Sequence, residues 1–112
     1  MIINKVNELN IKMVKGDSLS FTVQIEGLKV DLDTAYFTVK NNEGDLSPLL
    51  QKSLKNGITK VDTDKYLVMI TPRDTKYLED KSYFYDLEIR IGDSVHTIVK
   101  GLFKLVNDIT TN

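Results

Sequence analysis

The single histidine is the first residue to weigh as a catalytic group. His96 is the only imidazole in the 112 residues, and the chain contains no cysteine. A nucleophile–histidine site would therefore need all its partners to converge on this one side chain beside a hairpin turn. A lone histidine is far more often a surface residue. We expect no catalytic role for His96.

Two pairs of carboxylates have the spacing of oxygen ligands for calcium, namely Asp31 with Asp33 and Asp62 with Asp64. Neither pair belongs to a loop with the central glycine and terminal glutamate of an EF-hand. Aspartate is also common in loops because its side chain stabilises turns. No spacing among the 16 acidic residues selects a pair for glycoside hydrolysis, and no glycine-rich phosphate loop is present. The sequence predicts no metal, no cofactor and no enzyme.

Aromatic side chains offer a different chemistry, because their faces stack on sugar rings. The chain has five tyrosines and no tryptophan. The tyrosines are Tyr36, Tyr66, Tyr77, Tyr83 and Tyr85. Tyr83 comes just after a turn, at the corner where a strand begins, and there a tyrosine hydroxyl typically bonds back to the upstream backbone. We therefore expect a structural role for Tyr83.

Charge and composition limit the classes of partner. The 15 basic and 16 acidic residues give a net charge of -1. They are spread along the chain, so no broad field attracts nucleic acid or an anionic membrane. No apolar run has the length of a membrane span or a signal peptide. A hydrophobic content of 41% suffices for one core. We expect a soluble, single-domain protein.

The elements that must position these residues are strands. Between Ser82 and Leu105, apolar and polar side chains alternate on both sides of Gly92-Asp93, which predicts a β-hairpin with one apolar face. Shorter alternating runs predict strands over residues 9–13, 19–25 and 35–39.

The other segments are less regular. Residues 48–59 fit either an edge strand or a helical turn, and Lys52 and Lys55 favour the exposed edge. Residues 66–70 are apolar on both faces, as in a strand that is covered on both sides. Thr71 as N-cap with Pro72 next predicts a short helical turn through Leu78 that carries the chain between sheets. Gly101 is predicted to lie at a β-bulge.

These elements predict an all-β fold, a single immunoglobulin-like antiparallel β-sandwich of about seven to eight strands with one short helical turn. The domain covers residues 1–112, with an N-terminal arm at 1–7 and a C-terminal tail at 107–112. The predicted core is Phe21, Val23, Phe37, Val39, Val68, Ile70, Tyr85, Leu87 and Phe103.

Several motifs resemble small β-sandwich proteins of tailed bacteriophages and prophages. They are Gly16-Asp-Ser-Leu-Ser-Phe21, Val30-Asp-Leu32, Pro72-Arg-Asp-Thr-Lys-Tyr-Leu78, Tyr83-Phe-Tyr-Asp86, Gly101-Leu-Phe103 and Asp108-Ile-Thr110. The resemblance covers most of the chain from Gly16 onward. Lys81 departs from it, because those proteins usually have glycine in the turn before the tyrosine strand. Such domains occur in baseplate, tail-fibre attachment and capsid-decoration proteins.

The resemblance implies a non-enzymatic structural part of a virion, made in the cytoplasm of a bacterial host. Its partners would be further copies of itself and other virion proteins. The expected assembly contacts are Ile2, Ile3 and Val6 in the arm and Ile109 in the tail, since apolar ends can extend a neighbour's sheet. A carbohydrate-binding or adhesion module at a bacterial surface, using tyrosines such as Tyr36 and Tyr66, is the rival prediction, and an enzyme comes third.

Overall fold

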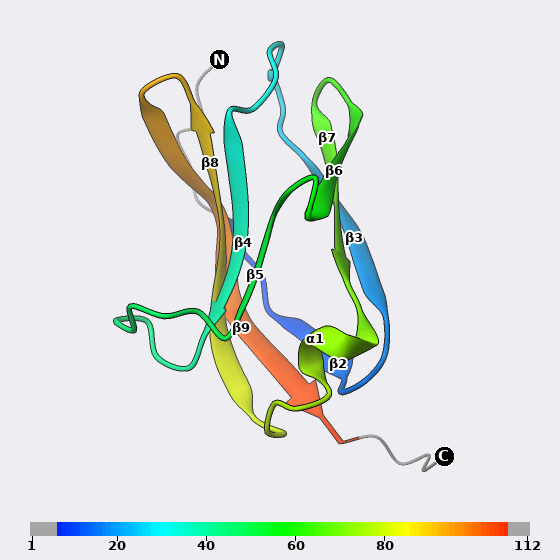
Figure 1. Ribbon diagram of the computed structural model, residues 1–112. Coiled ribbons are helices and arrows are strands. Elements are labelled where there is room, and N and C mark those ends of the chain that lie inside the picture. The colour runs from blue at the N-terminus through cyan, green and yellow to red at the C-terminus, as the bar shows by residue number, and fades with distance from the viewer. Residues whose placement is uncertain (1–6, 108–112) are drawn as a thin grey trace.

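Two layers of β-strands face each other in the computed structural model, which describes residues 7–107 (Figure 1). One layer contains β1 (Asn7–Glu8), β2 (Ile11–Val14), β4 (Thr34–Lys40), β8 (Ser82–Ile91) and β9 (Ser94–Val106). The other contains β3 (Leu19–Gln24), β6 (Gly57–Asp62) and β7 (Lys65–Ile70). β5 (Leu50–Leu54) joins the two layers. The predicted all-β sandwich is confirmed.

The strand order is β1-β9-β8-β4-β5-β6-β7-β3, and β2 also pairs with β9. The β8–β9 hairpin forms as predicted, with Ile91 opposite Ser94. Most strand pairs are antiparallel as predicted, but β1 and β2 run parallel to β9, and β5 and β6 share a short parallel pairing. The β5–β6 contact involves only two residue pairs beside a tight turn, whereas the longer parallel pairing with β9 needs a long connection. Most of the chain lies between β2 and β9 and supplies it.

β5 confirms the strand prediction for residues 48–59, but not the exposed edge. It pairs with β4 on one side and with β6 on the other. The Lys52 ammonium lies 2.7 Å from the Asp74 carboxylate, and only 12% of the Lys52 side chain is exposed. The Lys52 stem covers Gly57, where an added Cβ would come within 2.5 Å of the lysine Cδ. A strand with neighbours on both sides leaves this lysine little access to solvent.

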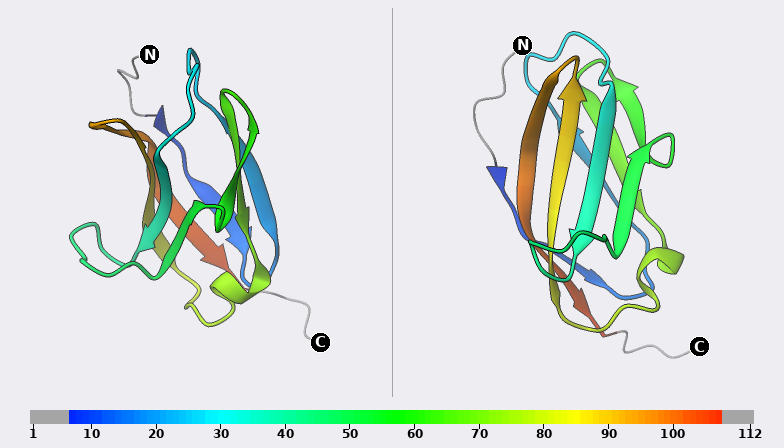
Figure 2. Two further views of the ribbon diagram at one scale, coloured as in Figure 1. Left: turned by 45° about the horizontal axis from the view of Figure 1, so that its top comes forward. Right: turned by 60° about the vertical axis from the view of Figure 1, so that its left-hand side comes forward.

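The helical turn α1 (Pro72–Thr75) begins as predicted at the N-cap Thr71. The Thr71 backbone N–H donates to the Asp74 carboxylate at 2.7 Å. The helix ends at Thr75, three residues before the predicted Leu78. It carries the chain from β7 to β8, and therefore from one layer to the other (Figure 2).

Two further predictions need correction. The register of β8 and β9 shifts between Leu87 and Glu88, which places the bulge at Ile98 and not at Gly101. β7 is covered on one face only, since Met69 is 47% exposed. Residues in this strand therefore alternate between core and surface like those of the other strands.

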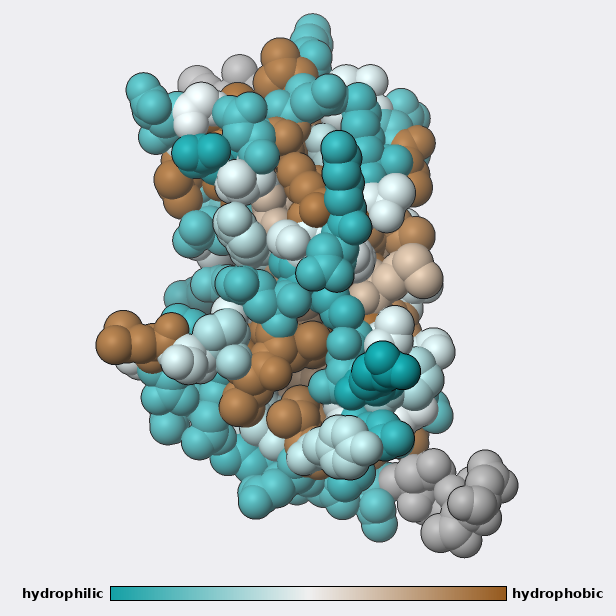
Figure 3. All heavy atoms as spheres, in the orientation of Figure 1, coloured by the Kyte–Doolittle hydropathy of each residue, from teal (hydrophilic) through white to brown (hydrophobic). Residues whose placement is uncertain are grey.

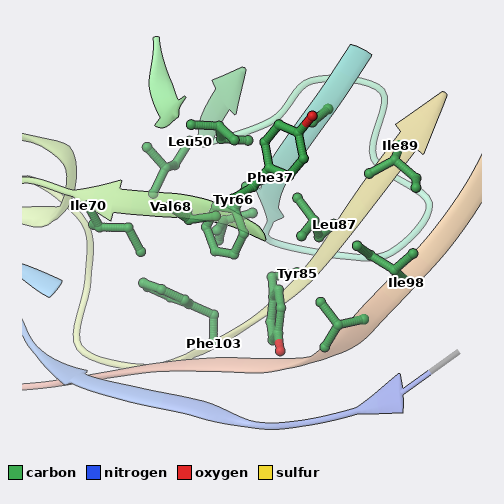
Figure 4. Packing of buried hydrophobic residues seen from close by; sticks show 14 of the residues in the cluster. Phe37, Leu50, Tyr66, Val68, Ile70, Tyr85, Leu87, Ile89, Ile98 and Phe103 are labelled. Carbon is green, nitrogen blue, oxygen red and sulfur yellow. The ribbon is translucent and has the colours of Figure 1, made fainter. Parts of the chain in front are cut away.

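The core is centred on Phe37 of β4 (Figure 4). Its ring lies 5.4 Å from that of Tyr85, 5.8 Å from that of Phe21 and 6.3 Å from that of Phe103, measured between centroids. Every predicted core residue is buried except Phe21 and Val23, which are half-buried. Both belong to β3, and this exception leads to the surface described next.

Candidate interaction surfaces

An apolar groove separates β3 from β1, β2 and β9. Its volume is about 970 Å³. The apolar side chains that line it are Leu9, Ile11, Leu19, Phe21, Val23, Ile25, Ile98 and Val99. Glu8, Lys12 and Glu26 are among its charged lining residues. Phe21 and Val23 stay half-buried because they face this opening.

The outer edge of β3 borders the same groove. β3 is the last strand in the sheet order, so no described residue pairs with its outer edge. Ile25 N–H donates to the Asp64 carbonyl at 2.8 Å, and bonded positions alternate along an antiparallel pair. The backbone groups of Ser20, Thr22 and Gln24 therefore point away from β7, toward the open edge.

A second, smaller pocket of about 300 Å³ lies on the outer face of β4, β8 and β9. Phe84 and Leu102 are 36% and 38% exposed there, beside five charged side chains. Burial raises the pKa of the Asp86 carboxyl and Glu88 adds to this effect, whereas Lys40 and Lys100 oppose it. This mixture of apolar and charged groups suits docking of a polar ligand or protein surface.

The predicted carboxylate pairs are engaged in turns and in contacts between strands. Asp31 accepts a bond from Lys60, and Asp33 accepts one from the backbone of the β8–β9 turn. Asp62 accepts from the next residue's N–H, and Asp64 accepts from a glutamine of β3. Residues 7–107 contain no group of three or more side chains that could hold a metal ion.

His96 lies on β9 opposite Ile89 and is half-buried. Lys15, in the turn that follows β2, pairs with Asp80 at 3.0 Å. Gly16 in the same turn has a φ of 86°, which glycine adopts without strain. This turn joins β2 to β3 at one end of the groove, so its residues have a structural role.

The five tyrosines do not share one surface. Tyr66, Tyr83 and Tyr85 are buried, which removes Tyr66 from the predicted sugar platform. The Tyr83 hydroxyl donates to the Glu79 carbonyl at 2.9 Å, and this confirms its predicted structural role. Only Tyr36 and Tyr77 are exposed, by 38% and 84%.

The expected assembly contacts Ile2, Ile3, Val6 and Ile109 lie outside the described residues. Asn7, the last residue of the predicted arm, begins β1 and lines the groove. Sequence reasoning missed the groove itself. The sequence shows that residues 19–24 carry no charge. It does not show whether the edge of this strand pairs with another strand.

No helix among residues 7–107 is long and apolar enough to cross a membrane.

No protein-family model matches the chain, and no curated protein is similar to it in sequence. Solved structures are similar in fold. The extracellular domains of the voltage-gated sodium channel beta4 subunit match with a TM-score of 0.51 at 14% identity, over 97% of this chain and 99% of that one. The immunoglobulin-like domain of mouse leukocyte-associated immunoglobulin-like receptor 1 matches with a TM-score of 0.53 at 13% identity, over 95% of each chain. The chain therefore has an immunoglobulin-like β-sandwich fold.

Proposed function

We propose that this protein is a non-enzymatic structural component of a phage or phage-like particle, acting through self-association and docking on other virion proteins. The observation that carries the proposal is the apolar groove beside the unpaired edge of β3. An open strand edge is a ready template for a strand from another chain. The resemblance of several motifs to those of phage sandwich proteins is the reason for proposing a virion.

Two of the solved structures with a similar fold are dimers of identical domains. The mouse receptor domain forms a strand-swapped dimer, and the sodium channel beta4 domains form parallel homodimers. These findings belong to those proteins. They support self-association here because this chain has the same fold and leaves the outer edge of β3 without a described partner.

Deletion of Met1–Val6 tests self-association through the arm. We expect the mass measured by light scattering to fall to that of a monomer, while the melting temperature stays close to that of the intact protein. Truncation of residues 110–112, which leaves Ile109 in place, is the matched control and should keep the larger mass. A wild-type protein that is monomeric at high micromolar concentration would contradict self-association.

Antibody labelling of purified phage particles, viewed in the electron microscope, tests whether the protein is part of the virion.

The smaller pocket favours a second candidate, a carbohydrate-binding or adhesion module at a bacterial surface. Tyr36 is exposed on the same outer face of β4 as Thr38, which lines this pocket. Glycan-array binding that is lost in Tyr36→Ala and retained in Tyr77→Ala would favour this candidate. Tyr66→Ala is unsuitable for the test because Tyr66 is buried and its hydroxyl accepts a bond from the Leu32 N–H.

A further inference from the structure

We propose that the open edge of β3 receives the N-terminal arm, Met1–Val6, of a second copy of this chain, which adds as an antiparallel strand and closes the groove. The inference rests on the proposed self-association and names the surface responsible for it. Three observations support it: the character of the edge, the side chains that line the groove and the direction of β1.

The edge of β3 has none of the usual protections against strand addition. Folded proteins block exposed edges with lysine, proline or bulges. β3 has the sequence Leu-Ser-Phe-Thr-Val-Gln, without charge or proline, and it pairs with β7 from Leu19 to Gln24 without a register shift. The strand on the opposite wall differs, since β1 and β2 carry Glu8 and Lys12 and are interrupted between them. Along β3, by contrast, the outer edge is uninterrupted over all six residues, and no described residue pairs with it.

The groove fits the alternating side chains of one added strand. Leu19, Phe21 and Val23 share a face of β3 and are half-exposed toward the groove. In an extended arm Ile2 and Val6 share one face, while Lys5 lies on the other. With Ile2 and Val6 turned into the groove, Lys5 reaches solvent. The arm has as many residues as β3, six, and spans about 20 Å when extended.

The direction of β1 favours an arm from a second copy over the chain's own arm. Asn7 and Glu8 pair with Val99 and Lys100, so the residues that follow the arm are held against β9, across the groove from β3. Because β1 is parallel to β9, the N-terminal end of β1 faces the β8–β9 hairpin. The hairpin and β3 lie on opposite sides of the molecule in two views (Figures 1 and 2). A chain's own arm would therefore have to leave β9 and cross the groove to reach Leu19.

Disulfide trapping tests the arrangement directly, since the natural chain has no cysteine. Ile3→Cys, on the same arm face as Lys5, is mixed under mild oxidation with one edge variant at a time. The edge variants are Ser20→Cys, Thr22→Cys and Gln24→Cys. Each chain carries a single cysteine, so a mixed disulfide identified by mass spectrometry joins two different copies. We expect a strong mixed disulfide at one of the three positions, the one in register with the arm.

Thr59→Cys is the matched control. Thr59 lies on the same outer face, two strands in from the edge, because Thr22 and Thr59 both pair with Leu67. It is about 10 Å from Thr22 and should give little disulfide. An equal yield at Thr59, or no disulfide at any edge position, overturns the proposal. So does an intramolecular disulfide as the main product of an Ile3→Cys/Thr22→Cys double variant.

Thr22→Pro provides an independent test without cysteine. Its N–H faces the open edge, so proline removes a donor for an added strand and keeps the bonds to β7. We expect Thr22→Pro to be monomeric with nearly unchanged thermal stability, whereas Val23→Pro loses a bond to β7 and should unfold. Association of Thr22→Pro as tight as that of the wild type overturns the inference but leaves self-association intact. A monomeric wild type overturns both.

Discussion

Gly101 shows how a single residue depends on a distant part of the chain. A Cβ at this position would lie 2.2 Å from the Leu9 carbonyl oxygen. Gly101→Ala should therefore push Leu9 away from β9 and cost about 1–3 kcal/mol of unfolding free energy. Gly44→Ala is the matched control, since its Cβ would meet nothing within 4 Å. Urea denaturation measures both, and equal stabilities would contradict the close approach.

Tyr85 should make stability fall at alkaline pH. Burial raises the pKa of its hydroxyl to about 12, and this hydroxyl donates to the Leu9 carbonyl. The unfolded chain loses the proton near pH 10, so the folded state binds it more tightly. The stabilisation is complete below pH 10 and is lost as the pH rises to about 12, a change of about 3 kcal/mol.

Tyr85→Phe isolates this contribution, because all other titrating groups remain. Urea midpoints measured from pH 9 to 12 should decline more steeply for the wild type than for Tyr85→Phe. Parallel curves would show that Tyr85 ionises equally easily in both states.

Tyr83 and Tyr85 also show what a sequence can predict at the scale of a residue. The Tyr83 hydroxyl bonds a carbonyl only four residues upstream, so the local sequence was sufficient. The contacts of Gly101 and Tyr85 are with Leu9, 76 residues before Tyr85. An isolated glycine in a strand fits a bulge and a close approach equally well, and only the fold distinguishes them.

At the scale of elements, Thr75 connects α1 to the turn between β2 and β3. Its side chain is fully buried, and its hydroxyl accepts a bond from the Gly16 N–H at 3.0 Å. Thr75→Val keeps the shape and removes the acceptor, which leaves a part-buried donor unpaired. We expect a loss of about 1–3 kcal/mol in the free energy of unfolding.

Thr75→Ser is the control for this prediction, because it keeps the hydroxyl and removes only a methyl group. It should retain more stability than Thr75→Val in thermal melts. The reverse order would mean that packing of the methyl group, and not the bond to Gly16, holds the turn against α1.

Local sequence signals predict where an element begins better than they predict which elements lie beside it in the fold. The N-cap and proline placed the start of α1 correctly at Thr71–Pro72, since a helix start depends on adjacent residues. The partners of β5 were not predictable in this way. In the sequence Lys52 resembles an exposed edge residue, but the fold places β6 next to β5 and Asp74 next to the Lys52 ammonium. The β3 groove was missed for the same reason, because an unpaired edge is a property of the whole sheet.

For the whole molecule, the aromatic cluster replaces the usual central link between the layers. Immunoglobulin domains join their two sheets by a disulfide packed against tryptophan. This chain has neither cysteine nor tryptophan. Phe37 instead contacts Phe21 of the second layer and Tyr85 and Phe103 of its own layer. The layers are therefore joined by this aromatic packing and by the backbone pairing of β5, without a disulfide.

Because a shared core and β5 join the layers, one core truncation should unfold both together. Leu87 is 2% exposed and pairs with Phe37 and Val99. Leu87→Ala should cost about 2–5 kcal/mol, a large share of the roughly 5–15 kcal/mol that stabilises a domain. Circular dichroism and tyrosine fluorescence should report the same shifted transition, since β5 couples the layers. Val95→Ala, at a site 56% exposed, should change little. Two separate transitions would show that the layers unfold independently.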